Sequence, residues 1–312
     1  MVRVDHQPKR TRLGIAIRAL LICSLALLLS ACEKQSRHKP QLCLILSNVS
    51  NPFFASIRDA ARKESARHGY PIDTYDSENS LQKENTLIQQ CISNKAGVIL
   101  LNPTDSFHSD NAVKLASEAK IPVITLDRAI RSNLAVSHVS SDNIIGGQMA
   151  ANLLERFLKG EGDIGMLVGI PDTDTAQQRG KGFIEQIKKG PLTLVGSEVG
   201  NFDRHQGKLA MQRLIKKHPQ IKAVFAQNDE MALGALQALL DHPSPPIVIG
   251  FDGSKRALSA IERGLLTATI AQQPDEMGST AVKLAAQLLE GDRIPPSVSS
   301  PLAQVIRTNK PN

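Results

Sequence analysis

The feature that most constrains the fold is a regular alternation of short apolar runs with amphipathic stretches of helix length. The apolar run Leu42–Leu46 is followed by a helical stretch at residues 55–68, and such pairs recur as far as about residues 275–290. Strands and helices that alternate in this way form parallel sheets, because each helix returns the chain across a face of the sheet. A second, similar series begins with the helical stretch at residues 144–158. We therefore predict an α/β protein with two doubly wound parallel-sheet lobes.

Polar residues directly follow the ends of several predicted strands. They are Asn102, Asp127, Arg128, Asn228, Asp252 and Gln272. Open parallel sheets bind their ligands at this edge. Asn and Asp are also ordinary turn residues, whereas Arg128 and Gln272 have no turn-forming role. Because a hydroxyl both donates and accepts hydrogen bonds, this mixture of amide, carboxylate and guanidinium groups suits a neutral ligand with many hydroxyls.

Four phenylalanines, Phe53, Phe54, Phe202 and Phe251, lie beside these polar residues. Phe53 and Phe54 end the loop at residues 47–54, in a chain with only 3% aromatic residues and no Trp. Packing in the core is one explanation for two adjacent rings, and a ring that faces a ligand cleft is the other. Flat rings that pack on C–H faces, together with fixed polar groups for hydroxyls, predict a sugar site.

The N-terminus predicts export and lipid attachment. Residues 1–31 hold five basic residues and one acid, and so carry more than half of the formal net charge of +7. The apolar run Ala19–Leu29 is too short for an ordinary transmembrane helix. It ends in Leu29-Ser30-Ala31-Cys32, which resembles the bacterial lipobox; an ordinary signal peptide with an incidental Cys is the alternative. We predict a lipoprotein signal peptide at residues 1–31, lipidation of Cys32, and a tether at residues 32–40. The mature protein would then lie in the periplasm, anchored to the membrane.

The remaining charge and cysteines exclude several classes of protein. The rest of the chain has a net charge of +3 and no dense run of Lys and Arg, so we expect no nucleic-acid partner. The spacing of Cys and His residues predicts no metal site. Cys43 and Cys91 are expected to be two buried thiols, and a disulfide in an oxidising compartment is the alternative.

An enzyme of similar build is the competing class. The G-x-G-x-x-G sequence at residues 160–165 follows a predicted helix and precedes a strand, the reverse of the order that binds a dinucleotide. The chain has no G-x-x-x-x-G-K-[ST], H-E-x-x-H or G-x-S-x-G sequence. Asp127 and Asp252 could be a pair of acids, but Arg128 beside Asp127 favours an ionised hydrogen-bond acceptor. We predict no catalytic residue and no cofactor.

Several longer runs carry a family resemblance. They are residues 51–54, 102–105, 121–128, 225–236, 250–253 and 269–272. Through them, residues 41–308 resemble the ribose-binding family of periplasmic pentose- and hexose-binding proteins of ABC importers, which share the lac-repressor effector fold. The resemblance implies sugar contacts at Asn51, Phe53, Phe54, Asp127, Arg128, Arg179, Phe202, Asn228, Phe251, Asp252 and Gln272. It places Ser47 and Asn102 behind them, and puts Phe54 and Phe202 on the two faces of the sugar with Phe53 and Phe251 at its edges.

The resemblance also implies the layout of a type 1 periplasmic binding protein. Residues 41–141 and 273–301 would form the N-terminal lobe, and residues 142–272 and 302–312 the C-terminal lobe, joined by a three-strand hinge near Ser141, Gln272 and Pro301. The lipobox and the loop at residues 172–175 depart from the family.

The partners follow from the same resemblance. The ligand would be D-ribose or a close pentose or hexose. The protein would be a monomer, and its partner in the membrane would be an ABC importer permease. A lipid-anchored sensor that presents sugar to a membrane or chemotaxis receptor is the alternative. The fold also serves transcription regulators, but here a lipobox signal occupies the place of their DNA-binding segment.

Overall fold

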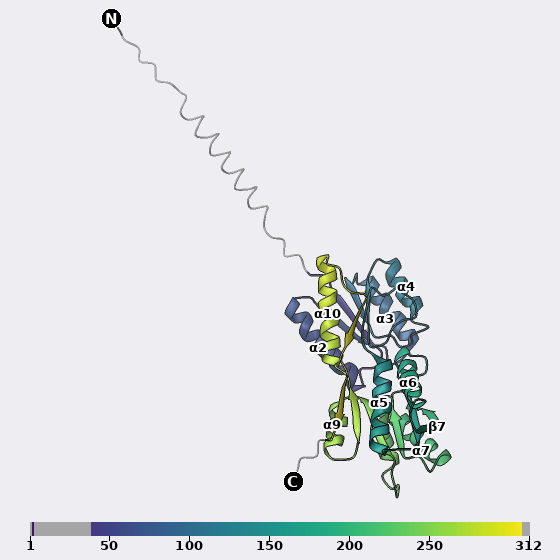
Figure 1. Ribbon diagram of the computed structural model, residues 1–312. Helices are drawn as coiled ribbons and strands as arrows, with labels where there is room; N and C mark the ends of the chain where they lie inside the picture. The colour runs from purple at the N-terminus through teal and green to yellow at the C-terminus, as the bar shows by residue number, and fades with distance from the viewer. Residues whose placement is uncertain (1, 3–38, 308–312) are drawn as a thin grey trace. The chain divides into compact units, whose positions relative to one another are not determined.

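The computed structural model describes residue 2 and residues 39–307, so the predicted signal peptide and Cys32 lie outside the described residues. The described strands form two six-stranded sheets (Figure 1). The predicted α/β class with two parallel-sheet lobes is confirmed. We call each sheet with its flanking helices a lobe.

The sheet of the first lobe is parallel throughout and has the strand order β11-β5-β4-β3-β1-β2. Its strands are β1 (Leu42–Leu46), β2 (Ile72–Asp76), β3 (Val98–Leu101), β4 (Val123–Leu126), β5 (Ser137–Ser141) and β11 (Ser297–Ser300). Its helices are α2 (Pro52–His68), α3 (Leu81–Ser93), α4 (Asp110–Glu118) and α10 (Pro274–Glu290).

The first lobe is layered because alternate strand residues face opposite sides of the sheet. Leu42, Leu44 and Leu46 pack with α2 and α10, whereas Cys43 and Ile45 pack with α3 and α4 on the other face (Figure 1). Both faces are covered, which is why β1 reads as a continuous apolar run rather than an alternating one.

The sheet of the second lobe has the order β12-β10-β9-β8-β6-β7, and its strands are parallel except for β12. The strands are β6 (Gly162–Val168), β7 (Leu192–Val199), β8 (Ala223–Ala226), β9 (Ile247–Asp252), β10 (Ala268–Ala271) and β12 (Ala303–Ile306). The helices are α5 (Asn143–Leu158), α6 (Asp174–Ile187), α7 (Arg204–Lys217), α8 (Asp229–Ala238) and α9 (Lys255–Glu262). The core with α5 and α6 lies on one face, and the core with α7, α8 and α9 on the other.

The chain passes between the sheets between β5 and α5, between β10 and α10, and between β11 and β12. The sequence did not indicate β11 and β12 as strands. Both are short, and exposed residues interrupt their burial, so neither has the apolar run that marks a buried strand.

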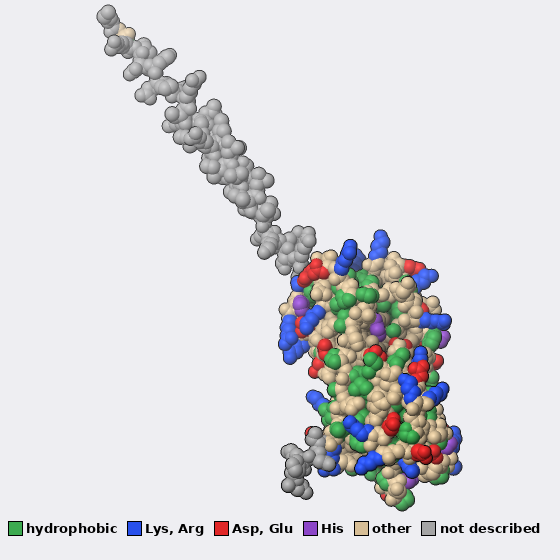
Figure 2. Space-filling model, viewed as in Figure 1, with side chains coloured by type: hydrophobic (Ala, Val, Ile, Leu, Met, Phe, Trp, Pro, Cys, Tyr) green, Lys and Arg blue, Asp and Glu red, His purple; other side chains and the backbone are tan. Residues whose placement is uncertain are grey.

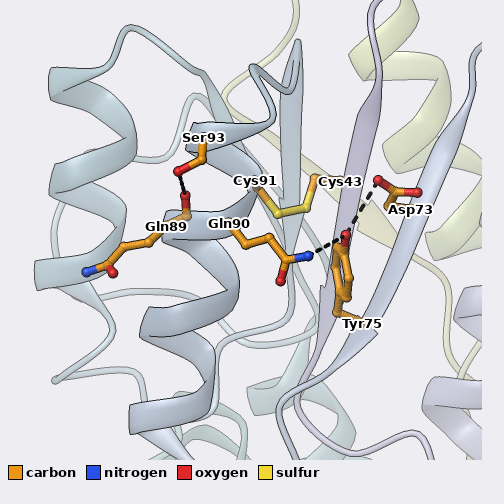
Figure 3. The surroundings of a disulfide bond; sticks show 7 residues. All are labelled: Cys43, Asp73, Tyr75, Gln89, Gln90, Cys91 and Ser93. Carbon is orange, nitrogen blue, oxygen red and sulfur yellow. Dashed lines mark hydrogen bonds between the residues drawn. A yellow bond between two sulfur atoms is a disulfide. The ribbon is translucent and has the colours of Figure 1, made fainter.

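Cys43 in β1 and Cys91 in α3 form a disulfide, with their Cα atoms 6.1 Å apart (Figure 3). The expectation of two free thiols is therefore wrong. The two residues are 48 positions apart in the chain, and only the packing of α3 on the sheet shows that they meet. In the same surroundings, Gln90 donates to the Tyr75 hydroxyl at 3.4 Å.

Charged side chains of both signs are interspersed on the face shown in Figure 2. No helix within the described residues is both long and apolar enough to cross a membrane.

Candidate ligand-binding site

The carboxyl ends of the strands of both lobes meet at one cavity. Its empty volume is about 260 Å³, a value that includes the open solvent at its mouth. Its lining residues are Asn51, Phe53, Phe54, Asp127, Arg128, Thr175, Arg179, Phe202, Asn228, Asp252 and Gln272. Every residue that we predicted to contact a ligand is in this lining except Phe251, and Thr175 is additional.

The start of α2 supplies two rings to the cavity. Asn51 caps the helix by accepting a hydrogen bond from the Phe53 amide at 3.0 Å, and Pro52 occupies the first turn, where a missing N–H costs nothing. The rings of Phe53 and Phe54 lie edge to face, with centroids 5.4 Å apart. Both rings belong to the core of the first lobe and also line the cavity. The two explanations offered for these rings, packing in the core and facing a ligand cleft, therefore hold together.

Asp127 follows β4 in a left-handed conformation, with φ of 57°. Asn102 holds this turn, because its Nδ2 donates to the Leu126 carbonyl at 3.1 Å and to Asp127 Oδ2 at 3.4 Å. Asn102 is held in turn by Ser47, whose amide and hydroxyl both donate to Asn102 Oδ1, at 3.1 and 2.6 Å. Ser47 and Asn102 are thus buried behind Asp127 and do not line the cavity.

Arg128 is a fully buried cation. Its Nη1 donates to the carbonyls of Pro103 and Thr104, at 3.1 and 3.3 Å. The guanidinium carbon lies 5.4 Å from the centre of the Phe54 ring and 5.8 Å from that of Phe202. Within the described part of the chain, Arg128 Nε has no hydrogen-bond partner.

Arg179 enters the cavity from α6 and is held by the second lobe. Its Nε donates to Asn143 Oδ1 and its Nη1 to the Gln227 carbonyl, both at 2.8 Å. The ring of Phe251 lies directly against the guanidinium, 3.9 Å from its carbon to the ring centre. Phe251 is wholly buried. It therefore supports Arg179 and is not among the residues that line the cavity.

Phe202 and Asn228 act together at the second lobe. Phe202 has a left-handed φ of 57°, and Asn228 Nδ2 donates to its carbonyl at 3.1 Å. Asn228 Oδ1 accepts from the Met231 amide at 2.9 Å and so caps α8. Gly169 gives the ring its space, because a Cβ at that position would lie 2.0 Å from Phe202 Cζ.

Asp252 and Gln272 form the side of the cavity nearest the crossing after β10. Gln272 Nε2 donates to Asp252 Oδ1 at 2.9 Å, and the Gln272 amide donates to the Asp252 carbonyl at 3.0 Å. Gln272 Oε1 is buried and, among the described residues, has no hydrogen-bond partner. Asp252 has a positive φ of 121° and is, with Asp127 and Phe202, the third residue of this site with a strained backbone.

The four charges of the cavity are separated by gaps instead of direct hydrogen bonds. Arg179 lies 4.0 Å from Asp127 and 3.9 Å from Asp252, and Arg128 lies 4.0 Å from Asp127. Burial raises the pKa of Asp127, and Arg179 and Arg128 oppose that rise. Burial also raises the pKa of Asp252 well above its ordinary value, against the attraction of Arg179. Arg179 thus lies within about 4 Å of both acids.

The chemistry of this cavity is that of a site for a neutral polar molecule. Two guanidinium groups and two carboxyl groups lie close together, and oxygen atoms of a ligand placed in the gaps would bind to both kinds. A buried polar atom without a partner costs free energy. Arg128 Nε and Gln272 Oε1, which belong to two lining residues, are such atoms among the described residues. No cluster of His, Cys, Asp and Glu residues that could hold a metal ion occurs in the described part of the chain.

Thr175 is a lining residue that the sequence analysis did not name. Thr175 lines the cavity from the first turn of α6, and its hydroxyl donates to Thr173 Oγ1 at 3.2 Å. No sequence signal marked it, since Thr at a helix start is an ordinary capping residue. His138 does not line the cavity, and its Nδ1 lies 2.9 Å from Thr125 Oγ1.

These two lobes, with a polar cavity between the ends of their strands, define a binding protein of the periplasmic class. The chain belongs to the periplasmic binding protein domain family, whose model matches residues 42–293. It is 40% identical over 270 residues to the ribose import binding protein RbsB of Salmonella typhimurium. This match covers 86% of this chain and 91% of that protein. It is 41% identical over 257 residues to RbsB of Escherichia coli K12, with 82% and 87% covered.

A solved structure agrees with this assignment. The ABC transporter solute binding protein of Bacillus halodurans, crystallised with bound myo-inositol, matches with a TM-score of 0.82 and 27% identity. The match covers 87% of this chain and 96% of that chain. The predicted family is thus confirmed, and its relatives are proteins of solute transport.

Proposed function

We propose that this protein captures D-ribose, or a closely related monosaccharide, between its two lobes without changing it chemically. The observation that carries the proposal is the lining of the cavity, in which two guanidinium groups, two carboxyl groups and aromatic rings surround one space. The identity to the two RbsB proteins supports ribose among neutral sugars.

Each part of the site has a role in this proposal. Phe54 and Phe202 pack on the C–H faces of the sugar. Asp127 and Asp252 accept hydrogen bonds from sugar hydroxyls, and Arg128 and Arg179 donate to their oxygens. Asn51, Asn228 and Gln272 complete the set with groups that donate and accept. Charge-assisted hydrogen bonds of this kind are stronger than neutral ones, so an inverted hydroxyl should cost much affinity.

Calorimetry of the purified protein tests the ligand. We expect D-ribose to bind most tightly in a panel that also holds D-arabinose, D-allose, D-galactose and myo-inositol. If another sugar of the panel binds instead, the site survives but the ligand is wrong. If no sugar binds at ligand concentrations up to the millimolar range, the binding-protein proposal fails.

We further propose that the protein delivers the sugar to an ABC importer permease while a lipid on Cys32 holds it at the membrane. Two or three acyl chains on one Cys anchor a protein stably, whereas one chain is marginal. Mass spectrometry of the mature N-terminus should show an acylated Cys32, and an unmodified N-terminus at another residue would refute the anchor. Uptake of labelled ribose that depends on this protein separates an importer from a sensor.

A further inference from the structure

Among the described residues, several direct hydrogen bonds join the two lobes beside the cavity, through Ser106 and Asp174. Ser106, in the loop after β3, donates from its hydroxyl to Asp174 Oδ1 at 3.1 Å. The same hydroxyl accepts from the Asp174 amide, in the first turn of α6, at 3.0 Å. The Ser106 amide donates to the Asp172 carbonyl at 3.1 Å. Helix α6 begins where the second lobe meets the first (Figure 1).

This contact also bears on residues that line the cavity. The Ala129 amide donates to the same Asp174 Oδ1 at 3.1 Å, and Ala129 directly follows Arg128. On the other lobe, Thr175 directly follows Asp174. The Arg131 amide donates to the Ser106 carbonyl at 2.8 Å and so links Ser106 to the segment after Arg128. Asp174 is thus placed to hold Arg128 and Thr175 on opposite walls of the cavity.

The contact is partly buried. Ser106 is buried, and Arg128 attracts the Asp174 carboxylate.

We propose that Ser106 and Asp174 form a latch that holds the two lobes closed over the cavity and lengthens the residence time of the bound sugar. The proposal rests on the proposed function. Asp174 does not line the cavity and acts as a positioning residue. Contacts that form only after the ligand has entered change its dissociation rate far more than its association rate.

The test is the release of radiolabelled D-ribose into an excess of unlabelled sugar. Asp174→Ala and Ser106→Ala should each release the sugar at least fivefold faster, with the association rate changed less than twofold. The double variant should be no faster than the faster single variant, because both changes break one contact. Asp174→Asn retains an acceptor oxygen and should restore most of the wild-type rate.

Asp172→Ala is the matched control. It removes an exposed carboxylate from the same loop and leaves the carbonyl that accepts from Ser106. It should release sugar at the wild-type rate. A structural role would instead lower the unfolding midpoint of the sugar-free protein, which Ser106→Ala should leave unchanged. Wild-type release rates in Asp174→Ala and Ser106→Ala, or a fall in that midpoint, would overturn the latch.

A cross-link separates failure of the latch from failure of the proposed function. The double variant Ser106→Cys with Asp174→Cys should form a disulfide between the lobes, detected by mass spectrometry after mild oxidation, whether or not ribose binds. Absence of that cross-link overturns the latch on its own. If the cross-link forms but the wild-type protein binds no sugar, the ligand assignment fails and the contact between the lobes stands.

Discussion

At the scale of single residues, hydrogen bonds to other protein groups fix the orientation of the two cavity arginines. Arg179 uses Nε and Nη1 on Asn143 and Gln227, and Arg128 uses Nη1 on two backbone carbonyls. A guanidinium fixed in this way can present its remaining N–H groups without losing rotamer freedom on binding. Glu84 extends the support of Arg128, since its Oε2 accepts from the Thr104 amide at 2.6 Å.

Arg128→Ala should weaken sugar binding strongly. The change removes a buried donor and leaves Asp127 without one of its two cations, and truncating a partner of a buried charge pair costs about 2–5 kcal/mol. Calorimetry should therefore show an affinity loss of about thirtyfold to several thousandfold. Arg131→Ala is the control, because Arg131 is exposed and lies over Phe107, outside the cavity lining. Equal affinity in both variants would remove Arg128 from the site.

Gly169→Ala should weaken sugar binding through Phe202. The added methyl would meet the Phe202 ring at 2.0 Å, so the ring must leave its place at the cavity. We expect at least a tenfold loss of affinity by calorimetry. In a Phe202→Ala background the same change should cost nothing further, because the clash is gone. An additive loss in the double variant would mean that Gly169 acts by another route.

At the scale of elements, the ends of strands and the loops after them carry both the geometry and the strain of the site. Asp127, Phe202 and Asp252 have positive φ values, a region that is unfavourable for residues other than glycine. Each costs on the order of 1–3 kcal/mol and persists only where its surroundings hold it. Hydrogen bonds from the side chains of Asn102, Asn228 and Gln272 hold Asp127, Phe202 and Asp252 respectively in place.

The Cys43–Cys91 disulfide should stabilise the first lobe without affecting the ligand. It joins β1 to α3 and closes a loop of 48 residues, for which removal typically costs about 2–4 kcal/mol. Denaturant unfolding of a variant with both Cys residues changed to Ala should show that loss. Ribose affinity should remain within twofold of wild type, since the site lies at the opposite end of β1. A variant as stable as wild type would show that the disulfide adds nothing.

Asp229 should make stability depend on pH. It begins α8 and accepts hydrogen bonds from Thr269 and the Ser254 amide, and burial raises its pKa to about 7. An acid whose pKa is raised on folding contributes its full stabilisation at pH values below its pKa in the unfolded chain, which is near 4. That stabilisation is lost as the pH rises through about 7.

The pH effect is measured as a difference between two proteins. The free energy of unfolding of the wild type should fall between pH 5 and pH 8, and Asp229→Asn should fall less. Denaturant titrations at intermediate pH values give both slopes. Parallel slopes would assign the pH dependence to other buried acids, such as Asp252 and Glu84, whose pKa values burial also raises.

At the scale of the whole molecule, two rigid sheets are linked by three chain crossings, and the cavity takes residues from both. Such lobes can rotate about the crossings as rigid bodies. A ligand that touches both lobes favours the closed arrangement, since only there does it make all of its contacts.

Small-angle scattering checks this motion. Saturating D-ribose should reduce the radius of gyration of the wild-type protein, whereas Arg128→Ala at the same ribose concentration should show a smaller change. An unchanged radius in the wild type, under conditions where calorimetry shows saturation, would contradict closure.

The sequence by itself determined the class of fold and most of the lining of the cavity. Apolar runs alternate with amphipathic stretches because both faces of each sheet are covered by helices, and this pattern is local along the chain. Polar residues after strands, such as Asp127 and Asn228, could be assigned because parallel strands end at one edge. Arg179 needed the family resemblance, since it lies within a helix and no local pattern marks it.

Only the tertiary structure decided the rest, because those features depend on contacts between distant segments. The Cys43–Cys91 pair, the place of Phe251 behind Arg179, and the Ser106–Asp174 contact all join residues far apart in the chain. Thr175 and the strands β11 and β12 have sequences that suit ordinary loops and caps equally well. A local pattern records burial and periodicity, but it does not record which partner a side chain meets when the two lobes close.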